Sequence, residues 1–149
     1  MVIERFPSRR HTQPESISDP GEKLKSIDHL SLIVANMHRD GKNVVLCHGV
    51  FDLLHMGHVR HLSEAKSHGD VLIVSITADA FVNKGPGKPV FSENLRAEML
   101  SSLAVVDYVT INRTPDAESL LEVLQPNIYV KGSDYRDEDT DITGKISLE

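Results

Sequence analysis

Hydrophobic and polar residues alternate along the chain in two different periods, which together predict a repeating order of helices and strands. Apolar side chains recur at helical spacing from Ile27 to Met37. Short β-branched apolar runs typical of buried strands lie at 44–47, 71–76, 108–111 and 127–130. Helical spacing returns at 59–67, 94–103 and 117–124. For the last of these helices, Thr114-Pro115 is the expected cap.

This alternation predicts an α/β fold, a Rossmann-like three-layer sandwich with a mainly parallel sheet. We expect residues 1–22 to form a loosely ordered N-terminal arm and residues 23–149 to form a single domain. With 149 residues and 40% hydrophobic content, the chain is large enough for one central core.

Charge and cysteine content exclude several classes of function. The formal net charge of −6 argues against nucleic-acid binding, because nucleic-acid-binding domains normally present a basic surface. A single cysteine excludes an intramolecular disulfide framework. No apolar run approaches the roughly 20 residues that a membrane span needs. Acidic residues interrupt the arginines near the N-terminus, so a transit peptide is not predicted and the cytoplasm is the expected compartment.

The segment 49–58 joins a predicted strand to a predicted helix, and it is the strongest candidate for a functional site. Backbone N–H groups and the helix dipole at such a turn favour phosphate. Gly49 lets the backbone pass close to a ligand, and Gly57 leaves space between two imidazoles. His55 and His58 are three residues apart and can point into the same pocket. This arrangement suits an oligophosphate ligand.

A zinc site is the main alternative for this segment. His55 and His58, with Cys47 or His48, could supply ligands and leave one coordination position open. Zinc-binding pairs on a helix usually lie four residues apart with a separate third ligand, and Gly57 suits phosphate access better. We therefore predict no metal ligands among the side chains, and we expect Cys47 to pack inside the sheet.

The run His55-Met56-Gly57-His58 resembles the His-x-Gly-His signature of the nucleotidyltransferase superfamily, which includes the cytidylyltransferases. The resemblance extends over 51–62, Ala65-Lys66 and Gly69-Asp70. The run 130–135 resembles a Val-Lys-Gly-Gly-Asp-Tyr stretch in the adenylyltransferase domain of bacterial ADP-heptose synthases. Together these matches cover roughly residues 43 to 136 and are most similar to that branch of the superfamily.

The resemblance implies roles for individual residues. The implied catalytic residues are His55, His58 and Lys84. In the resembling family the two histidines contact nucleotide phosphates and stabilise the pentacoordinate transition state, and a lysine in the loop of Lys84 binds phosphate. The implied nucleotide-binding residues are Gly49, Val50, Phe51, Gly57, His58, Lys131, Gly132 and Asp134. The implied substrate-binding residues are Asp52, Arg96 and Lys88. Magnesium is implied as the partner of the nucleotide.

Each of these roles has a simpler structural alternative. Lys84 and Lys88 lie in the glycine- and proline-rich segment 80–89, which could be an ordinary solvated loop. Arg96 could be an exposed helical charge, although a guanidinium can grip phosphate through paired donors. Asp52 could cap the following helix. The segment that contains Lys131, Gly132 and Asp134 could be a plain turn.

Family members usually continue with another strand and a Ser/Thr-rich phosphate motif, and neither is evident before the chain ends at Glu149. The chain is therefore expected to be a fragment of a longer protein, one that carries a sugar-kinase domain as ADP-heptose synthases do, or else to have an incomplete phosphate site; we favour the fragment. The expected reaction is transfer of a nucleoside monophosphate, with ATP favoured, to a sugar-1-phosphate, with heptose-1-phosphate favoured. The alternatives are a cytidylyltransferase acting on glycerol phosphate or another phospho-alcohol, and a non-catalytic nucleotide-sensing or assembly domain. A homodimer is also expected from the resemblance.

Overall fold

A computed structural model describes residues 20–83, 85–131 and 146–148 of this protein. The helices are α1 (Pro20–Lys23), α2 (Ile27–Arg39), α3 (Met56–Lys66), the 3-10 turn η1 (Asp79–Phe81), α4 (Glu93–Ser101) and α5 (Glu118–Leu124). The strands are β1 (Val44–Gly49), β2 (Val71–Thr77), β3 (Tyr108–Asn112), β4 (Ile128–Lys131) and β5 (Ile146–Leu148). Of the predicted arm at 1–22, residues 1–19 lie outside the described residues. Residues 20–22 belong to α1.

The strands form one sheet in the order β3-β2-β1-β4-β5. β1 to β4 are parallel to one another, and β5 is antiparallel to β4. The predicted α/β, mainly parallel architecture is therefore confirmed. β5 was not predicted, because a run of three residues carries too little periodicity to identify and its pairing with β4 defines it.

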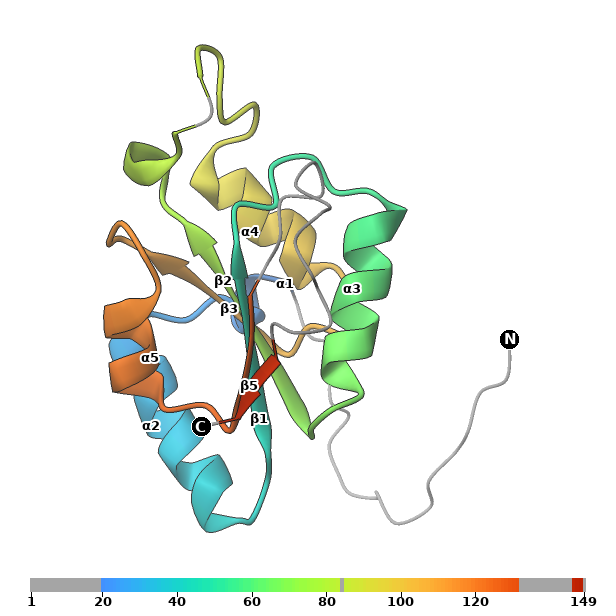
Figure 1. The fold of residues 1–149 in the computed structure, drawn as a ribbon, viewed down its shortest axis with the longest axis vertical. Coiled ribbons are helices and arrows are strands. Elements are labelled where there is room, and N and C mark those ends of the chain that lie inside the picture. The colour runs from blue at the N-terminus through green and yellow to red at the C-terminus, as the bar shows by residue number, and fades with distance from the viewer. Residues whose placement is uncertain (1–19, 84, 132–145, 149) are drawn as a thin grey trace.

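Helices cover both faces of the sheet, as Figure 1 shows. α3 and α4 pack on one face through Leu62, Ala65, Ala97 and Leu100, all of them buried against residues of β1 and β2. α2 and α5 pack on the other face through Leu30, Val34, Leu120 and Leu124. Because both faces of the sheet are covered, the strands read as continuous apolar runs rather than as alternating ones.

Helix boundaries differ from the sequence predictions at two N-termini. α3 begins at Met56, three residues before the predicted start, because His55 takes the N-cap position. The expected cap of α5 at Thr114-Pro115 is wrong: the N-cap is Ala117, and a carboxylate oxygen of Asp116 accepts the backbone N–H of Glu118 at 3.0 Å. In both cases a side-chain acceptor next to the helix sets the start, and apolar periodicity does not report such an acceptor.

The strand order reverses at β1. β2 and β3 lie on one side of β1, whereas β4 lies on the other. In open parallel sheets, ligands bind in the crevice outside the carboxyl ends of the strands at such a reversal. The topology therefore predicts a ligand site at the carboxyl ends of β1 and β4, where Gly49 and Lys131 are the last strand residues.

Candidate functional site

The two histidines of the turn after β1 are held by the first turn of α3. Nδ1 of His55 accepts the backbone N–H of Gly57 at 3.0 Å, and Nδ1 of His58 accepts the backbone N–H of His55 at 3.3 Å. The two side chains thus form a capping box, a role usually taken by serine or threonine with glutamate. Their ring centroids are 4.0 Å apart. The predicted convergence of the two imidazoles is confirmed.

These hydrogen bonds determine which ring nitrogen carries the proton. A neutral imidazole has one N–H donor and one acceptor nitrogen, and in both rings Nδ1 is the acceptor. Nε2 therefore carries the proton in each neutral ring. Both imidazoles can donate from Nε2 without first becoming protonated.

Phe51 has a left-handed backbone conformation, and its side chain packs under this turn in the core. Its φ is +51°, although a bulky side chain in this region typically costs about 1–2 kcal/mol. The ring is buried in the core beneath α3 and meets the ring of His58 edge-on, with the centroids 5.5 Å apart. A Cβ on Gly49 would lie 2.9 Å from the Phe51 ring, so glycine is needed there to admit it.

Glycine is needed at position 57 for a similar steric reason. A Cβ at this position would lie 2.8 Å from Cε1 of His55. The position therefore gives room to the His55 ring, as the sequence analysis expected of this glycine. Its backbone N–H is also the donor that orients that ring.

Asp52 does not cap α3, so that alternative is wrong. Its two carboxylate oxygens accept the backbone N–H groups of Val90 and Phe91, at 2.7 and 3.0 Å. These residues lie 38 and 39 positions further along the chain, beyond the reach of local sequence reasoning. Asp52 thereby attaches the segment 85–91, which precedes α4, to the turn 49–58, called here the histidine turn.

Arg96 is fully buried, so the alternative of an exposed helical charge is also wrong. Nε donates to the carbonyl of Phe91, and Nη1 donates to the carbonyls of Val50 and Thr77. Nη2 donates to a carboxylate oxygen of Asp79 at 2.6 Å. Four of the five N–H donors of a guanidinium are thus directed at protein acceptors. The predicted phosphate contact of Arg96 stays a prediction, and the geometry assigns this side chain a structural task.

Two acidic residues that the sequence analysis did not single out complete this network. Asp79 neutralises the buried guanidinium, and its backbone N–H donates to Glu93 at 2.8 Å. Glu93 also pairs with Arg113 at 2.7 Å. The hydrogen bond from the Asp79 N–H, followed by the Arg113 guanidinium, holds the pKa of Glu93 below its ordinary value. No local motif marks these two residues, because their partners lie 14 to 20 positions away in sequence.

A polar row crosses the sheet on the face that α2 and α5 cover. Lys131, His48, Ser75 and Thr110 are register neighbours on β4, β1, β2 and β3. His48 contacts the hydroxyl of Ser75 through Nδ1 at 2.7 Å. Burial lowers the pKa of His48 against the opposing influence of Asp116. Ser75, inside the otherwise apolar run 71–76, was the available signal for this row.

Cys47 lies inside the sheet, as predicted. It is fully buried in the core beneath α3, and burial raises the pKa of its thiol to about 12. A thiol that resists deprotonation in this way is a poor zinc ligand. In the described parts of the chain, no group of three or more His, Cys, Asp or Glu side chains is arranged to hold a metal ion.

The remaining candidates are placed only in part. Lys131 ends β4, next to β1 in register with His48, on the same edge of the sheet as the histidine turn. Lys88 is exposed in the segment that Asp52 holds. Three candidates, Lys84, Gly132 and Asp134, lie outside the described residues.

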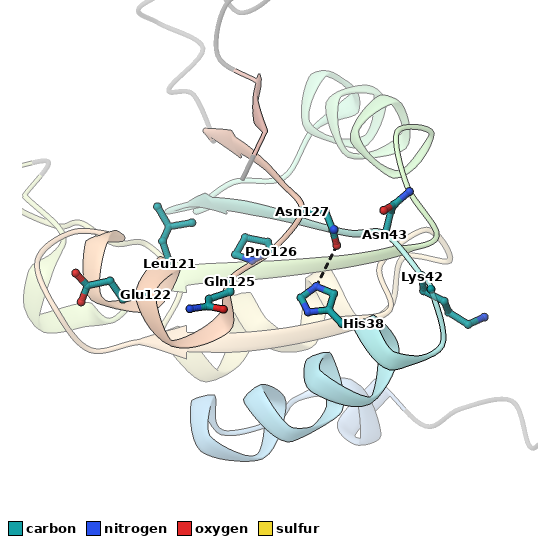
Figure 2. A pocket seen from close by; sticks show the side chains of 9 residues that line it. His38, Lys42, Asn43, Leu121, Glu122, Gln125, Pro126 and Asn127 are labelled. Carbon is teal, nitrogen blue, oxygen red and sulfur yellow. Dashed lines mark hydrogen bonds between the residues drawn. The ribbon is translucent and has the colours of Figure 1, made fainter.

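An open cavity of about 650 Å³ lies at the opposite end of the sheet (Figure 2). It is lined by the loop between α2 and β1 and by the loop between α5 and β4. Nε2 of His38 and the Asn127 side chain meet there at 3.1 Å. The C-termini of α2 and α5 point toward this end, and helix C-termini disfavour anions. The helix termini at this cavity therefore disfavour a phosphate ligand.

The chain is similar to known proteins over most of its length. A family described as cytidylyltransferase-like matches residues 46–145. The chain is 38% identical over 136 residues to "Bifunctional protein HldE" of Aliarcobacter butzleri and 41% identical over 134 residues to the protein of that name from Geobacter metallireducens. These matches cover 88% and 89% of this chain but 29% and 27% of the two relatives. The chain thus spans less than a third of their length.

A solved structure shows the same architecture. The lipopolysaccharide core biosynthesis protein from Thermoplasma volcanium aligns with a TM-score of 0.56 and 30% sequence identity. The alignment covers 68% of this chain and 87% of that protein. Within the described residues, none of the helices is long and apolar enough to cross a membrane.

Proposed function

Because the chain belongs to the cytidylyltransferase-like family and is a nucleotidyltransferase, we propose that it transfers an adenylyl group from ATP to a sugar-1-phosphate, with heptose-1-phosphate as the favoured acceptor. The observation that carries the proposal is the imidazole pair at the N-terminus of α3, held at the point where the strand order reverses. The sequence identity of 38% and 41% to two proteins named HldE supports the choice of heptose-1-phosphate as the acceptor.

The proposed reaction needs no general base. A phosphate monoester has a second pKa near ~6, so at neutral pH its oxygen is already largely ionised and nucleophilic. This oxygen attacks the α-phosphorus of ATP and forms a new P–O bond. The bond from the α-phosphorus to the oxygen bridging to the β-phosphorus breaks, and pyrophosphate leaves with that electron pair.

The task left to the protein is to stabilise negative charge on the α-phosphate and on the departing pyrophosphate. The Nε2–H groups of His55 and His58 are donors in the neutral state, and the N-terminus of α3 adds its partial positive charge. Their hydrogen bonds to the backbone fix both rings before the nucleotide arrives. Preorganised donors of this kind lower the barrier because they do not reorient during the reaction.

Magnesium enters this proposal as the counter-ion of the triphosphate. Magnesium usually keeps several waters and binds substrate phosphates together with one or two carboxylates. Two carboxylates that the structure describes at this end of the sheet already have partners, since Asp52 holds two backbone N–H groups and Asp79 pairs with Arg96. We therefore assign no protein ligand to the ion.

We also propose that the parent protein carries a sugar-kinase domain and that the transferase domain forms a homodimer. The relatives are named bifunctional, and this chain matches less than a third of each. A kinase would supply the phosphorylated sugar that the transferase consumes. Size-exclusion chromatography with light scattering tests the dimer.

Pyrophosphate release tests the proposed activity directly. The chain, alone and extended with its native flanking sequence, is incubated with magnesium, ATP or CTP, and a panel of phosphorylated sugars and alcohols. Release with ATP and a sugar-1-phosphate is the expected result. Release only with CTP and a phospho-alcohol would replace the proposed substrates, whereas nucleotide binding without release by either form would favour a sensing domain.

A further inference from the structure

The histidine turn is fixed from two sides of its strained residue. Phe51 has the left-handed φ of +51°. On its N-terminal side, the carbonyl of Val50 accepts Nη1 of Arg96 at 3.0 Å. On its C-terminal side, the carboxylate of Asp52 holds the N–H groups of Val90 and Phe91. A strained residue persists where its surroundings over-determine it, and here both flanking residues are anchored.

The same two side chains hold the segment before α4. Asp52 accepts the N–H of Phe91, and Arg96 donates to the carbonyl of that residue through Nε at 3.0 Å. Both the backbone N–H and the carbonyl of Phe91 are thus hydrogen-bonded to these two side chains. Lys88 lies three residues earlier on the exposed stretch of the segment, within a turn closed by its own N–H bonding to Gly85.

Arg96 serves as the buried anchor of this assembly. Its guanidinium is fully buried and compensated by Asp79, and it also binds the last residue of β2 through the carbonyl of Thr77. A buried charge without its partners is strongly disfavoured, so the guanidinium holds each carbonyl in place. Three chain segments at the carboxyl edge are thereby tied to one side chain.

We propose that Asp52 and Arg96 are positioning residues that hold the His55–His58 turn and the Lys88 segment in one fixed relative geometry. The proposal rests on the proposed function, in which His55 and His58 meet the phosphates, and on the substrate-binding role that the family resemblance implies for Lys88. In this assignment both residues act through the histidines and Lys88.

Amide hydrogen exchange tests the coupling without requiring turnover. Asp52→Asn keeps the side-chain shape but turns an NH₂ toward one of the two backbone donors. Exchange should become at least ~10-fold faster at Val90 and Phe91, and also at His55 and Gly57, because loss of one attachment loosens both segments. Faster exchange at Val90 and Phe91 with unchanged exchange at His55 and Gly57 would overturn the proposal, as would no change at any of the four.

A matched control lies at the other end of the sheet. A carboxylate oxygen of Asp70 accepts the backbone N–H of Asn43 at 2.7 Å. Asp70→Asn should speed exchange at Asn43 and leave the carboxyl edge unchanged. If Asp70→Asn loosened His55 and Gly57 to the same extent, the effect would reflect general destabilisation and the proposal would fail.

A double-mutant cycle then separates positioning from a purely structural role. Lys88→Ala should lower kcat/KM about tenfold in the parent protein, but less than about threefold when Asp52 is already Asn, because the lysine is then no longer in place. Additive losses would contradict the proposal. A parent protein that released no pyrophosphate would count against the proposed function, and hydrogen exchange would still decide the coupling.

Discussion

The two ends of the sheet are built from similar parts but present helix termini of opposite polarity. At the carboxyl end, the N-terminus of α3 meets the turn that holds His55 and His58. At the amino end, the C-termini of α2 and α5 surround the cavity beside His38 and Asn127. Each end has an imidazole and an aspartate that accepts backbone N–H, Asp52 at one and Asp70 at the other.

The difference lies in the direction of the helices and in the rigidity of the backbone. The carboxyl end presents a helix N-terminus, which attracts anions, and it holds a left-handed Phe51 between two anchors. The amino end presents helix C-termini, where the left-handed Gln125 is an ordinary C-cap conformation. Dipole direction and anchored geometry therefore favour phosphate at the carboxyl end rather than at the amino end.

The strongest test of this contrast removes one imidazole at each end. His55→Ala or His58→Ala should lower turnover by ~100-fold or more, the loss typical of removing one preorganised transition-state donor. His38→Ala, at an exposed histidine with a side-chain partner at the other end of the sheet, should leave turnover within about twofold. The measurement is the steady-state rate of pyrophosphate release. Near-normal turnover in either carboxyl-end variant would refute the catalytic assignment.

A smaller perturbation adds a single methyl group at the carboxyl end. Gly57→Ala places a Cβ 2.8 Å from the His55 ring, and the ring must move to accommodate it. We expect roughly tenfold slower turnover, because misplacing a reacting group by about 1 Å is already costly. The melting temperature should not fall, since alanine favours a helix over glycine by roughly 0.5–1 kcal/mol.

Ser63→Ala, at an exposed position of the same helix, serves as the control for Gly57→Ala. It should change neither turnover nor melting temperature. A loss of stability in Gly57→Ala that matched its loss of activity would mean that the glycine serves the fold rather than the ring position.

The polar row at the carboxyl end should make stability depend on pH. Burial lowers the pKa of His48 from its ordinary 6.5, so the unfolded chain binds this proton more readily than the folded protein does. The contribution is fully present above pH 6.5 and is lost as the pH falls toward the lowered folded value. His48→Asn should reduce the slope of unfolding free energy against pH in that window, by at most about 1.4 kcal/mol per pH unit.

Urea denaturation at a series of pH values measures this slope. Some slope should remain in His48→Asn, because burial also lowers the pKa of His61. An unchanged slope would show that His48 does not titrate differently in the folded and unfolded states.

The smallest expected effect concerns the outer rim of the carboxyl end. The Arg113 side chain is 62% exposed in its pair with Glu93. Arg113→Ala should change the unfolding free energy by less than about 1 kcal/mol, as is usual for a solvated pair. Thermal unfolding checks this value. A larger loss would mean that the pair supports the Asp79 and Arg96 network more strongly than its exposure suggests.

Much of the fold follows from local patterns. Apolar periodicity located α2 to α5 and β1 to β4 to within a few residues, because buried faces impose a period on the sequence. The residues 49–58 were placed correctly at a strand-to-helix turn for the same reason. β5 and the N-cap role of His55 were missed, since one depends on a distant strand and the other on an imidazole in an unusual capping role.

The sequence by itself therefore determined the α/β class, the position of the strand-to-helix turn at 49–58 and the identity of its two imidazoles. Tertiary structure alone decided that Arg96 is buried, that Asp52 holds Val90 and Phe91, and that Phe51 is left-handed. Periodicity and turn chemistry are local properties of the chain, so the sequence displays them directly. A buried charge or a strained backbone depends on partners 17 to 46 positions away in sequence, and only folding brings those partners together.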